Sequence, residues 1–206
     1  TEVILKSYIE WGNKCVNKFV GAFAFAIYDG KKDIVFMARD RTGIKPYYYS
    51  LLEDGSFLFS SEPKGILGYP GFKKEPDNET IADYFLGMLT FAAGNAGLDK
   101  SFFKGIMGFN PGTYAIFDKN GLKINEYWDV PIFTKQLHDK RKNFVKELGR
   151  KVEKAIKIRL PDEVKFGTAL SGGLDSSIIT AVADDNFNGN LLSSSIKFKG
   201  DTKVGQ

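Results

Sequence analysis

Apolar and polar residues alternate along the first part of the chain in short runs that are separated by turn-forming residues. The apolar runs are residues 22–28, 34–38, 57–60, 113–117 and 122–127. Asp-Gly or Asn-Gly between two such runs is a strong hairpin signal. The turns predicted on this basis are residues 29–32, 53–55 and 118–121. The pattern therefore predicts an antiparallel sheet that is built from hairpins.

Apolar residues at helical spacing predict helices over residues 2–11, 14–19, 62–67 and 80–89. In the first helix the apolar residues on one side are Val3, Ile4, Tyr8 and Trp11. In the last helix we expect these side chains to face inward: Ile81, Tyr84, Phe85 and Met88. The aromatic run Tyr47–Tyr49 is expected to alternate between core and surface, because successive side chains of a strand point to opposite faces.

The pattern changes after a linker near residues 133–138. A long basic helix is predicted over residues 140–159, and it is followed by a strand, a helix and a strand at residues 164–170, 175–184 and 191–198. A strand, a helix and a strand at this spacing form a βαβ unit. The second part is therefore predicted to begin a parallel α/β sheet.

Composition narrows the function classes. Apolar residues make up 43% and charged residues 26% of the 206 residues, as in an ordinary globular protein. Since no apolar run reaches the roughly 18–20 residues of a membrane helix, we expect no membrane partner. The net charge is +4. The segment richest in Lys and Arg also carries apolar residues at helical spacing, so we interpret its basic residues as the solvated face of a helix. We therefore expect no nucleic-acid partner.

Cys15 is the single cysteine, which excludes an internal disulfide and fits a cytoplasmic location. The chain begins at Thr1 without an initiator Met and stops at Gln206 soon after a predicted strand. We expect both ends to be cuts in a longer protein.

One short motif carries chemistry. Residues 171–177 read Ser-Gly-Gly-Leu-Asp-Ser-Ser, and they lie between a predicted strand and a predicted helix. The first amides of a helix attract anions, and glycine lets the backbone approach a phosphate closely. A Walker A loop is excluded because the motif lacks its lysine. We expect Ser171, Gly172, Gly173, Asp175, Ser176 and Ser177 to bind phosphate, with Asp175 holding Mg²⁺ through the phosphates.

This motif resembles the Ser-Gly-Gly-x-Asp-Ser loop of ATP pyrophosphatases, which grips the β- and γ-phosphates of ATP. Earlier blocks resemble class II glutamine amidotransferase domains: residues 1–5, 21–29, 38–46, 59–67, 103–106, 111–114 and 127–129. The order of the blocks and the motif resembles that of glutamine-hydrolysing asparagine synthetases, and the resemblance covers nearly the whole chain.

The resemblance implies a fold and two domains. Residues 1–133 would be the C-terminal part of an antiparallel, Ntn-hydrolase-like glutaminase domain. Residues 138–206 would be the N-terminal part of a parallel α/β ATP-pyrophosphatase domain of the adenine nucleotide alpha hydrolase type. The fold class expected is thus α/β and α+β.

The resemblance also implies an activity. Aspartate and ATP would give β-aspartyl-AMP and pyrophosphate, and ammonia from glutamine would then give asparagine and AMP. Glutamine, aspartate and ATP would be substrates, with Mg²⁺ as cofactor. Ala169, Leu170 and Ile196 would bind the adenine. Two nearby positions depart from the family, which usually has an aromatic residue in place of Ser194 and glycine in place of Lys197.

The glutaminase nucleophile of the family is an N-terminal cysteine, and no residue of this chain fills that role. The catalytic residues are therefore unknown, and this chain alone is expected to be inactive. We interpret Cys15 as a small buried residue, Arg39, Asp40 and Arg41 as a local ion-pair cluster, and the single histidine, His138, as a solvated linker residue.

Two alternatives stay open at this point. The first is an amide-forming relative without a glutaminase, similar to β-lactam synthetases or lasso-peptide cyclases. The second is a non-catalytic nucleotide-binding module. The acceptor carboxylate and the oligomeric state are also open, with a homodimer as one alternative.

Overall fold

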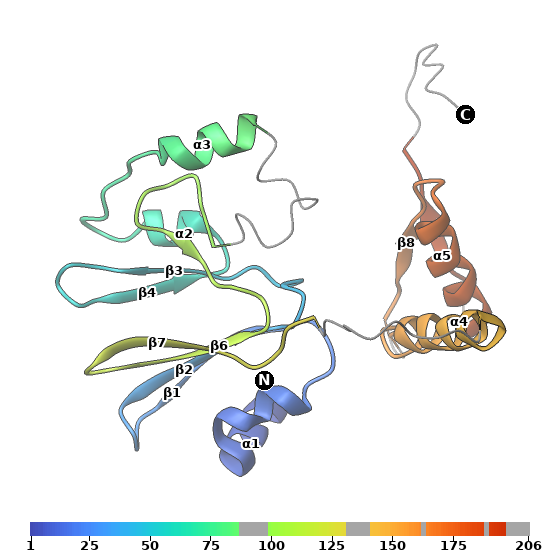
Figure 1. Ribbon diagram of the computed structural model, residues 1–206, viewed down its shortest axis with the longest axis horizontal. Helices are drawn as coiled ribbons and strands as arrows, with labels where there is room; N and C mark the ends of the chain where they lie inside the picture. The colour runs from blue at the N-terminus through green and yellow to red at the C-terminus, as the bar shows by residue number, and fades with distance from the viewer. Residues whose placement is uncertain (87–98, 131–140, 162–163, 188–189, 197–206) are drawn as a thin grey trace. The chain divides into compact units, whose positions relative to one another are not determined.

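The computed structural model describes residues 1–86, 99–130, 141–161, 164–187 and 190–196 (Figure 1). The chain divides into two compact units, Thr1–Ile132 and Phe133–Gln206. The structure confirms the coarse prediction of a mixed α/β protein with an antiparallel sheet. The assignment of the two ranges to particular domain types stays a prediction.

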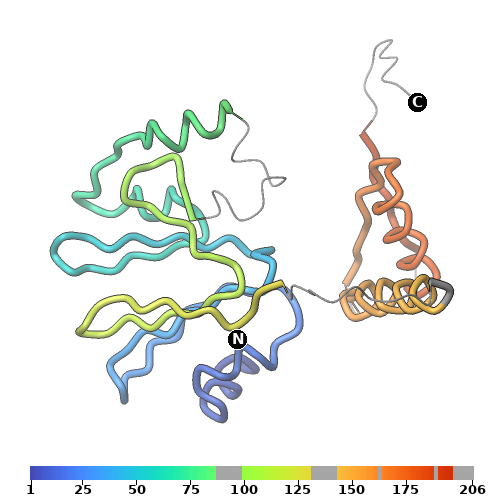
Figure 2. The backbone as a smooth tube through the Cα atoms, in the orientation of Figure 1, coloured from blue at the N-terminus to red at the C-terminus, as the bar shows by residue number. Residues whose placement is uncertain are grey.

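Two antiparallel sheets form the first unit, and short helices accompany them (Figure 2). Its helices are α1 (Glu2–Trp11), the 3₁₀ helix η1 (Gly12–Lys18), α2 (Pro63–Leu67) and α3 (Asn78–Phe85). Its strands are β1 (Ala24–Asp29), β2 (Ile34–Arg39), β3 (Tyr48–Leu51), β4 (Phe57–Ser60), β5 (Met107–Gly108), β6 (Thr113–Asp118) and β7 (Gly121–Glu126). The strand orders are β1-β2-β6-β7 in one sheet and β4-β3-β5 in the other.

All three predicted hairpins are confirmed. β1 pairs with β2, β3 with β4 and β6 with β7, each antiparallel and each across the turn that the sequence signals. The central contact β2–β6 joins two hairpins that lie far apart in the sequence, with Phe36 opposite Ile116. The two-residue strand β5 was not predicted, since it is too short to show a period.

Side-chain size explains how the layers pack. In β1 the large residues Phe25 and Ile27 face the helix α1 side, where they pack around the fully buried Phe36. Ala24 and Ala26 face the other sheet, against a cluster that contains the buried Tyr49. Because small residues of one sheet meet aromatic residues of the other, the space between the sheets is filled without overpacking.

The apolar side of the first helix is buried only in part. Val3 is 73% exposed, because α1 buries only the narrow stripe around Ile4, Ser7 and Tyr8. Trp11 is also largely exposed, and the ammonium group of Lys18 lies over its ring. The helix predicted at residues 14–19 is instead the 3₁₀ helix η1.

Two polar contacts hold helix α3 at its ends. The Asp77 carboxylate caps the helix by accepting a bond of 2.8 Å from the Thr80 amide, and Asp83 pairs with Lys100 at 2.5 Å. Tyr84 and Phe85 were predicted to face inward, but both are exposed. The predicted inward position Met88 lies outside the described residues.

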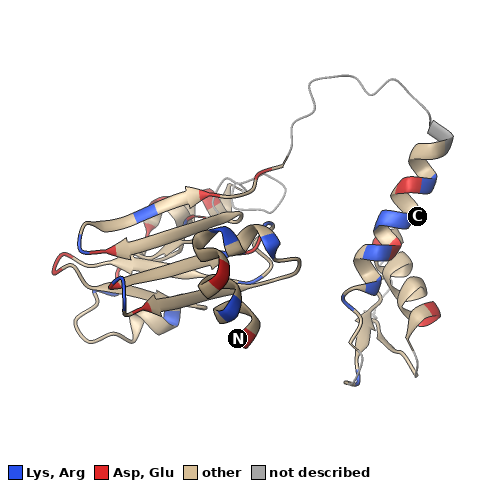
Figure 3. Ribbon diagram, turned by 90° about the horizontal axis from the view of Figure 1, so that it is seen from below, with Lys and Arg blue, Asp and Glu red and all other residues tan. Residues whose placement is uncertain are grey.

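The second unit contains α4 (Arg141–Lys157), β8 (Gly167–Ala169), α5 (Leu174–Asn186) and β9 (Leu192–Ser194). β8 and β9 pair in parallel across α5, which confirms the predicted βαβ unit. Basic residues outnumber acidic ones along α4 (Figure 3), and Lys151 and Lys157 pair with Glu147 and Glu153 one turn away. No helix in the described ranges is both long and apolar enough to span a membrane.

Candidate nucleotide-phosphate site

The chain bends sharply between the end of β8 at Ala169 and the start of α5 at Leu174. Gly172 makes this bend with a φ of +87°, a conformation that favours glycine. A Cβ atom at Gly172 would meet no other atom within 4 Å, so its surroundings are open. The strand, the glycine bend and the helix thus occur in the order that the sequence predicts.

The start of α5 is suited to bind an anion. Gly173 is the N-cap residue, and no side chain of the described residues caps the helix. The first-turn amides of a helix have no intrahelical acceptor and carry partial positive charge. Since Gly172, Gly173 and Asp175 are exposed, an incoming phosphate can reach these amides.

The three serines of the motif bond to one another and to the bend. The hydroxyls of Ser176 and Ser177 donate to the Gly173 carbonyl oxygen at 3.0 and 2.8 Å. The Ser171 hydroxyl lies 3.0 Å from that of Ser176. The structure therefore brings together the predicted phosphate-binding residues, and it shows their hydroxyls engaged with the protein itself.

The structure brings some of the predicted adenine-binding residues close to one another. Ala169 is opposite Ser194 in the parallel register, and the Leu170 amide donates to the Ser194 carbonyl oxygen at 2.9 Å. The Ser195 hydroxyl donates to the Leu170 carbonyl oxygen at 2.7 Å. Ile196 follows β9 and is 85% exposed. The departure at Ser194 thus leaves a small side chain beside Ala169, and Lys197 lies outside the described residues.

A chain of hydroxyl groups joins β8 to its neighbours, and sequence reasoning missed it. Thr180 of α5 donates to the Thr168 hydroxyl at 3.1 Å, and Thr168 lies 3.0 Å from the Ser193 hydroxyl of β9. Thr168 and Ser193 are opposite each other in the register. Hydroxyl residues at matched strand positions are the signal that could have revealed this link between strand, helix and strand.

The residues present are compatible with Mg²⁺ held through phosphates. No group of three or more metal-ligating side chains occurs in the part of the chain that the structure describes. Mg²⁺ is usually bound by one or two carboxylates together with substrate phosphates, so a dedicated cage is not required. Asp175 supplies one exposed carboxylate in the first turn of α5, beside the open glycine bend.

Cys15 is not a nucleophile candidate. Its side chain is fully buried in η1, where it packs with Tyr8 and Val16. Burial raises the pKa of the Cys15 thiol, so the reactive thiolate is disfavoured. The interpretation of Cys15 as a small core residue is confirmed, and His138 lies outside the described residues.

The expected ion-pair cluster at Arg39, Asp40 and Arg41 is wrong. No salt bridge joins these residues within the described ranges. Instead the Asp40 carboxylate accepts bonds from four backbone amides at 3.0 to 3.2 Å, and Arg39 donates to three backbone carbonyls. Burial raises the pKa of the Asp40 carboxyl, but the amide donors outweigh this, and the net result is a lowered pKa.

Three of the sequence blocks that suggested a family meet at this loop. The Gly112 amide donates to the Asp40 carbonyl oxygen at 3.0 Å, and the Tyr127 hydroxyl donates to the Arg39 carbonyl oxygen at 2.8 Å. Gly112 has a φ of +66°, and a Cβ atom there would collide with the Trp128 carbonyl oxygen. These residues therefore hold the backbone in place, and their role here is structural.

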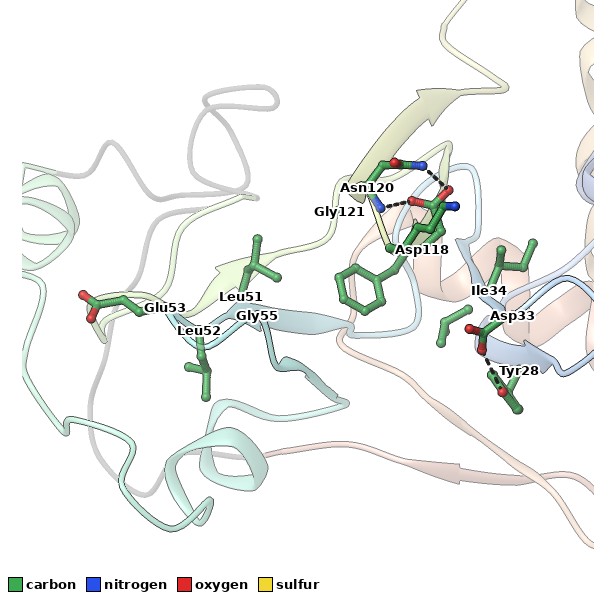
Figure 4. A pocket seen from close by; sticks show the side chains of 13 residues that line it. Tyr28, Asp33, Ile34, Leu51, Leu52, Glu53, Gly55, Asp118, Asn120 and Gly121 are labelled. Carbon is green, nitrogen blue, oxygen red and sulfur yellow. Dashed lines mark hydrogen bonds between the residues drawn. The ribbon is translucent and has the colours of Figure 1, made fainter.

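A hollow of about 570 Å³ lies at the hairpin turns of the first unit (Figure 4). Two of its acidic side chains, Asp33 and Asp118, form hydrogen bonds within the turns themselves. Asp33 accepts from the Tyr28 hydroxyl at 3.0 Å, and Asp118 accepts from the Asn120 amide at 2.7 Å. We therefore assign no chemistry to this hollow.

Comparison with known proteins gives two family matches. The family described as "Glutamine amidotransferase domain" matches residues 1–128, and the family described as "Asparagine synthase" matches residues 147–204. "Asparagine synthetase [glutamine-hydrolyzing] 3" of Bacillus subtilis is 40% identical over 91% of this chain and 29% of its own length. "Putative asparagine synthetase [glutamine-hydrolyzing] 2" of Methanocaldococcus jannaschii is 39% identical over 88% of this chain and 34% of its own length.

A fungal relative bears a different name. "Amidase chyE" of Penicillium rubens is 30% identical over 89% of this chain and 26% of its own length. The chain thus spans about a third or less of the length of each of these relatives.

Proposed function

The chain belongs to the glutamine amidotransferase domain family, and from this premise we propose that it is part of an enzyme that converts aspartate to asparagine with ATP and glutamine. The relatives named as glutamine-hydrolysing asparagine synthetases support this proposal. They do not favour the alternatives of a glutaminase-free amide-forming enzyme or a non-catalytic nucleotide-binding module. The two ranges 1–133 and 138–206 would belong to an Ntn-hydrolase-like glutaminase domain and an ATP-pyrophosphatase domain.

The proposed reaction has two steps at the second domain. The aspartate β-carboxylate attacks the α-phosphorus of ATP, so β-aspartyl-AMP forms and pyrophosphate leaves. Ammonia released from glutamine then attacks the activated carbonyl carbon, and AMP leaves as asparagine forms. The pyrophosphate portion carries most of the charge, which is why an anion site is needed beside the reacting phosphorus.

One observation carries the proposal, namely the uncapped start of α5 directly after the Ser-Gly-Gly bend. Exposed first-turn amides and the open surroundings of Gly172 suit a pyrophosphate group. We propose Ser171, Gly172, Gly173, Asp175, Ser176 and Ser177 as the residues of this ATP and pyrophosphate site. Mg²⁺ would neutralise phosphate charge there, with Asp175 as its protein ligand.

The adenine would lie at the carboxyl ends of β8 and β9. In open parallel sheets this is the edge at which ligands bind. Ala169 and Leu170 lie at this end of β8, and Ile196 follows β9. The small Ala169 and Ser194 side chains, which are opposite each other, leave room for a flat ring.

The use of ATP, glutamine and aspartate as substrates suggests the cytoplasm as the location of the proposed reaction. A homodimer stays a prediction that no described residue tests. The glutaminase nucleophile and the residues that bind glutamine and aspartate are not assigned to this chain.

The proposal is tested by pyrophosphate release from the full-length protein with ATP, Mg²⁺ and aspartate. We expect release that depends on aspartate, and we expect Asp175→Ala to abolish it while the melting temperature stays unchanged. Asp185→Ala is the matched control, because it removes the same exposed carboxylate from the far end of α5. Full activity in Asp175→Ala, or equal loss in both variants, would contradict the site.

A further inference from the structure

A second hollow of the first unit, with a volume of about 500 Å³, lies beside the end of strand β3. Three segments line it: residues 50–54 at the end of β3, residues 69–73 and 75 between α2 and α3, and residues 104–105. Ligand pockets usually measure roughly 300–1,000 Å³, so the hollow is large enough for a small molecule. None of the residues proposed for ATP lines it.

Backbone hydrogen bonds hold the walls of this hollow in place. The Phe72 amide donates to the Tyr69 carbonyl oxygen at 3.1 Å, so the segment between α2 and α3 turns back on itself. The Lys104 amide donates to the Glu75 carbonyl oxygen at 3.0 Å and joins the same segment to the loop at residues 104–105. The hollow is therefore formed without a ligand, and a ligand has little backbone to order when it binds.

The Ser50 side chain faces this hollow and not the core between the sheets. Tyr49 packs between the sheets, and successive side chains of a strand point to opposite faces. Figure 4 shows Leu51 and Leu52 on opposite sides of the chain, so Ser50 shares the side of Leu52. Ser50 is 2% exposed, and its hydroxyl makes no hydrogen bond to any residue that the structure describes. Because a buried hydroxyl without a partner is unfavourable, this group is suited to bond a polar atom of a ligand.

Two opposite charges line the hollow and have no salt bridge within the described ranges, namely Glu53 and Lys73. The other charged side chains of the lining are engaged. Glu75 pairs with Lys104 at 3.7 Å, and Asp54 accepts a backbone amide bond of 2.8 Å within its own turn. A ligand that carries one negative and one positive group would therefore find a partner for each.

The rest of the lining is mostly apolar, and two of its side chains are aromatic. The apolar residues are Leu51, Leu52, Tyr69, Pro70 and Phe72. Aromatic rings of a ligand pack favourably against such side chains, edge to face or offset. An apolar wall with a few polar groups is the usual arrangement of a small-molecule site, in which the polar groups fix the orientation of the ligand.

We propose that this hollow binds a free α-amino acid with an aromatic side chain. The ligand carboxylate pairs with Lys73 and accepts a hydrogen bond from the Ser50 hydroxyl. The ligand ammonium group pairs with Glu53, and the ligand ring packs against Tyr69 and Phe72. The inference does not depend on the proposed function, because the hollow shares no residue with the bend between β8 and α5.

The test uses the full-length protein and para-fluoro-L-phenylalanine, whose fluorine NMR signal broadens when it binds. We expect broadening that an excess of L-phenylalanine reverses. Phenylpropionate lacks the ammonium group and phenethylamine lacks the carboxylate. Each should compete about two- to fivefold more weakly than L-phenylalanine, which is the factor for one exposed ion pair.

Protein variants show whether the ligand binds in this hollow. Lys73→Met and Glu53→Gln should each weaken binding about two- to fivefold, and Ser50→Ala should weaken it about fivefold through one lost hydrogen bond. Lys74→Met is the matched control, because Lys74 is the next residue, is also exposed and does not line the hollow. Its binding should equal that of the wild type.

Two results would overturn the proposal: no broadening with the wild-type protein, or equal binding by Lys73→Met and Lys74→Met. The melting temperature of each variant is measured as well. If Ser50→Ala were unfolded, the comparison of the two lysine variants, both changed at exposed positions, would still decide. Pyrophosphate release plays no part in this test, so its outcome is separate from that of the proposed function.

Discussion

Replacing Asp40 by Asn is expected to destabilise the first unit strongly. Asp40 is 1% exposed, and each of its carboxylate oxygens accepts from two backbone amides. Asn keeps one acceptor oxygen and places an NH₂ group against two amide donors. Two hydrogen bonds to a charged group are therefore lost, at roughly 1.5–3 kcal/mol each, so we expect a loss of about 3–6 kcal/mol.

That loss is large compared with the stability of a domain, which is about 5–15 kcal/mol. It corresponds to a fall of roughly 10–25 °C in the melting temperature of a unit of this size. Differential scanning calorimetry of wild type, Asp40→Asn and Asp54→Asn measures it. Asp54 is exposed and accepts one amide bond of 2.8 Å, so its variant should show the much smaller shift. Equal shifts in the two variants would refute the assignment of Asp40 as the centre of the loop.

The same carboxylate predicts a pH dependence. Its pKa is lowered in the folded protein, so its contribution to the free energy of unfolding is complete above the unfolded value of about 3.9. The contribution is lost as the pH falls through the folded pKa. The stability difference between wild type and Asp40→Asn should therefore be largest near neutral pH and should shrink below about pH 4. A difference that does not change down to pH 2.5 would contradict this.

Three further predictions concern other buried positions. Tyr47→Phe should stabilise the protein by about 1 kcal/mol in chemical denaturation, since the buried Tyr47 hydroxyl has no partner among the described residues; a loss of stability would show that it has one. Gly112→Ala should lower the free energy of unfolding by more than about 2 kcal/mol, because it adds a collision with Trp128 to the strain of positive φ. Gly55→Ala, whose surroundings are open, should lower it by about 1 kcal/mol, and equal effects of the two variants would contradict this. Labelling of Cys15 by a thiol reagent, followed by mass spectrometry, should occur only in denaturant, and rapid labelling of the native protein would contradict its burial.

Local signals predicted the hairpins and the βαβ unit well. In the Asn-Gly turn before Leu122, Gly121 has a φ of +104°, which few residues other than glycine adopt. In the turn after Tyr28 the residue with positive φ is Asp33, at +52°, and not Gly30 of the Asp-Gly signal. Strand β8 is three residues long, although the apolar run predicted seven, and a short run alone does not set where pairing stops.

Long-range contacts were not predictable in the same way. Tyr84 and Phe85 look like core residues by their period but are exposed, and Asp77 and Asp83 of this region have polar partners that the sequence pattern does not reveal. The arrangement at Asp40 was missed for the same reason. Adjacent charges suggested an ion pair, but in the folded chain backbone amides donate their hydrogen bonds to the Asp40 carboxylate.

The candidate phosphate site was predicted by residue type, and the roles within it were not. Serine, glycine and aspartate between a strand and a helix indicated anion binding. Only the structure shows that the Ser176 hydroxyl bonds to both Ser171 and Gly173, whereas the Ser177 hydroxyl bonds to Gly173 alone. The sequence gives the residue types but not these hydrogen bonds.

The fate of oxygen in the proposed reaction tests the account most directly. Aspartate labelled with ¹⁸O in its β-carboxylate is incubated with the full-length protein, ATP, Mg²⁺ and glutamine, and the products are analysed by mass spectrometry. Attack of the carboxylate on the α-phosphorus predicts one ¹⁸O atom in each AMP and none in pyrophosphate. Label in inorganic phosphate together with ADP, or AMP without label, would contradict adenylation at the bend between β8 and α5.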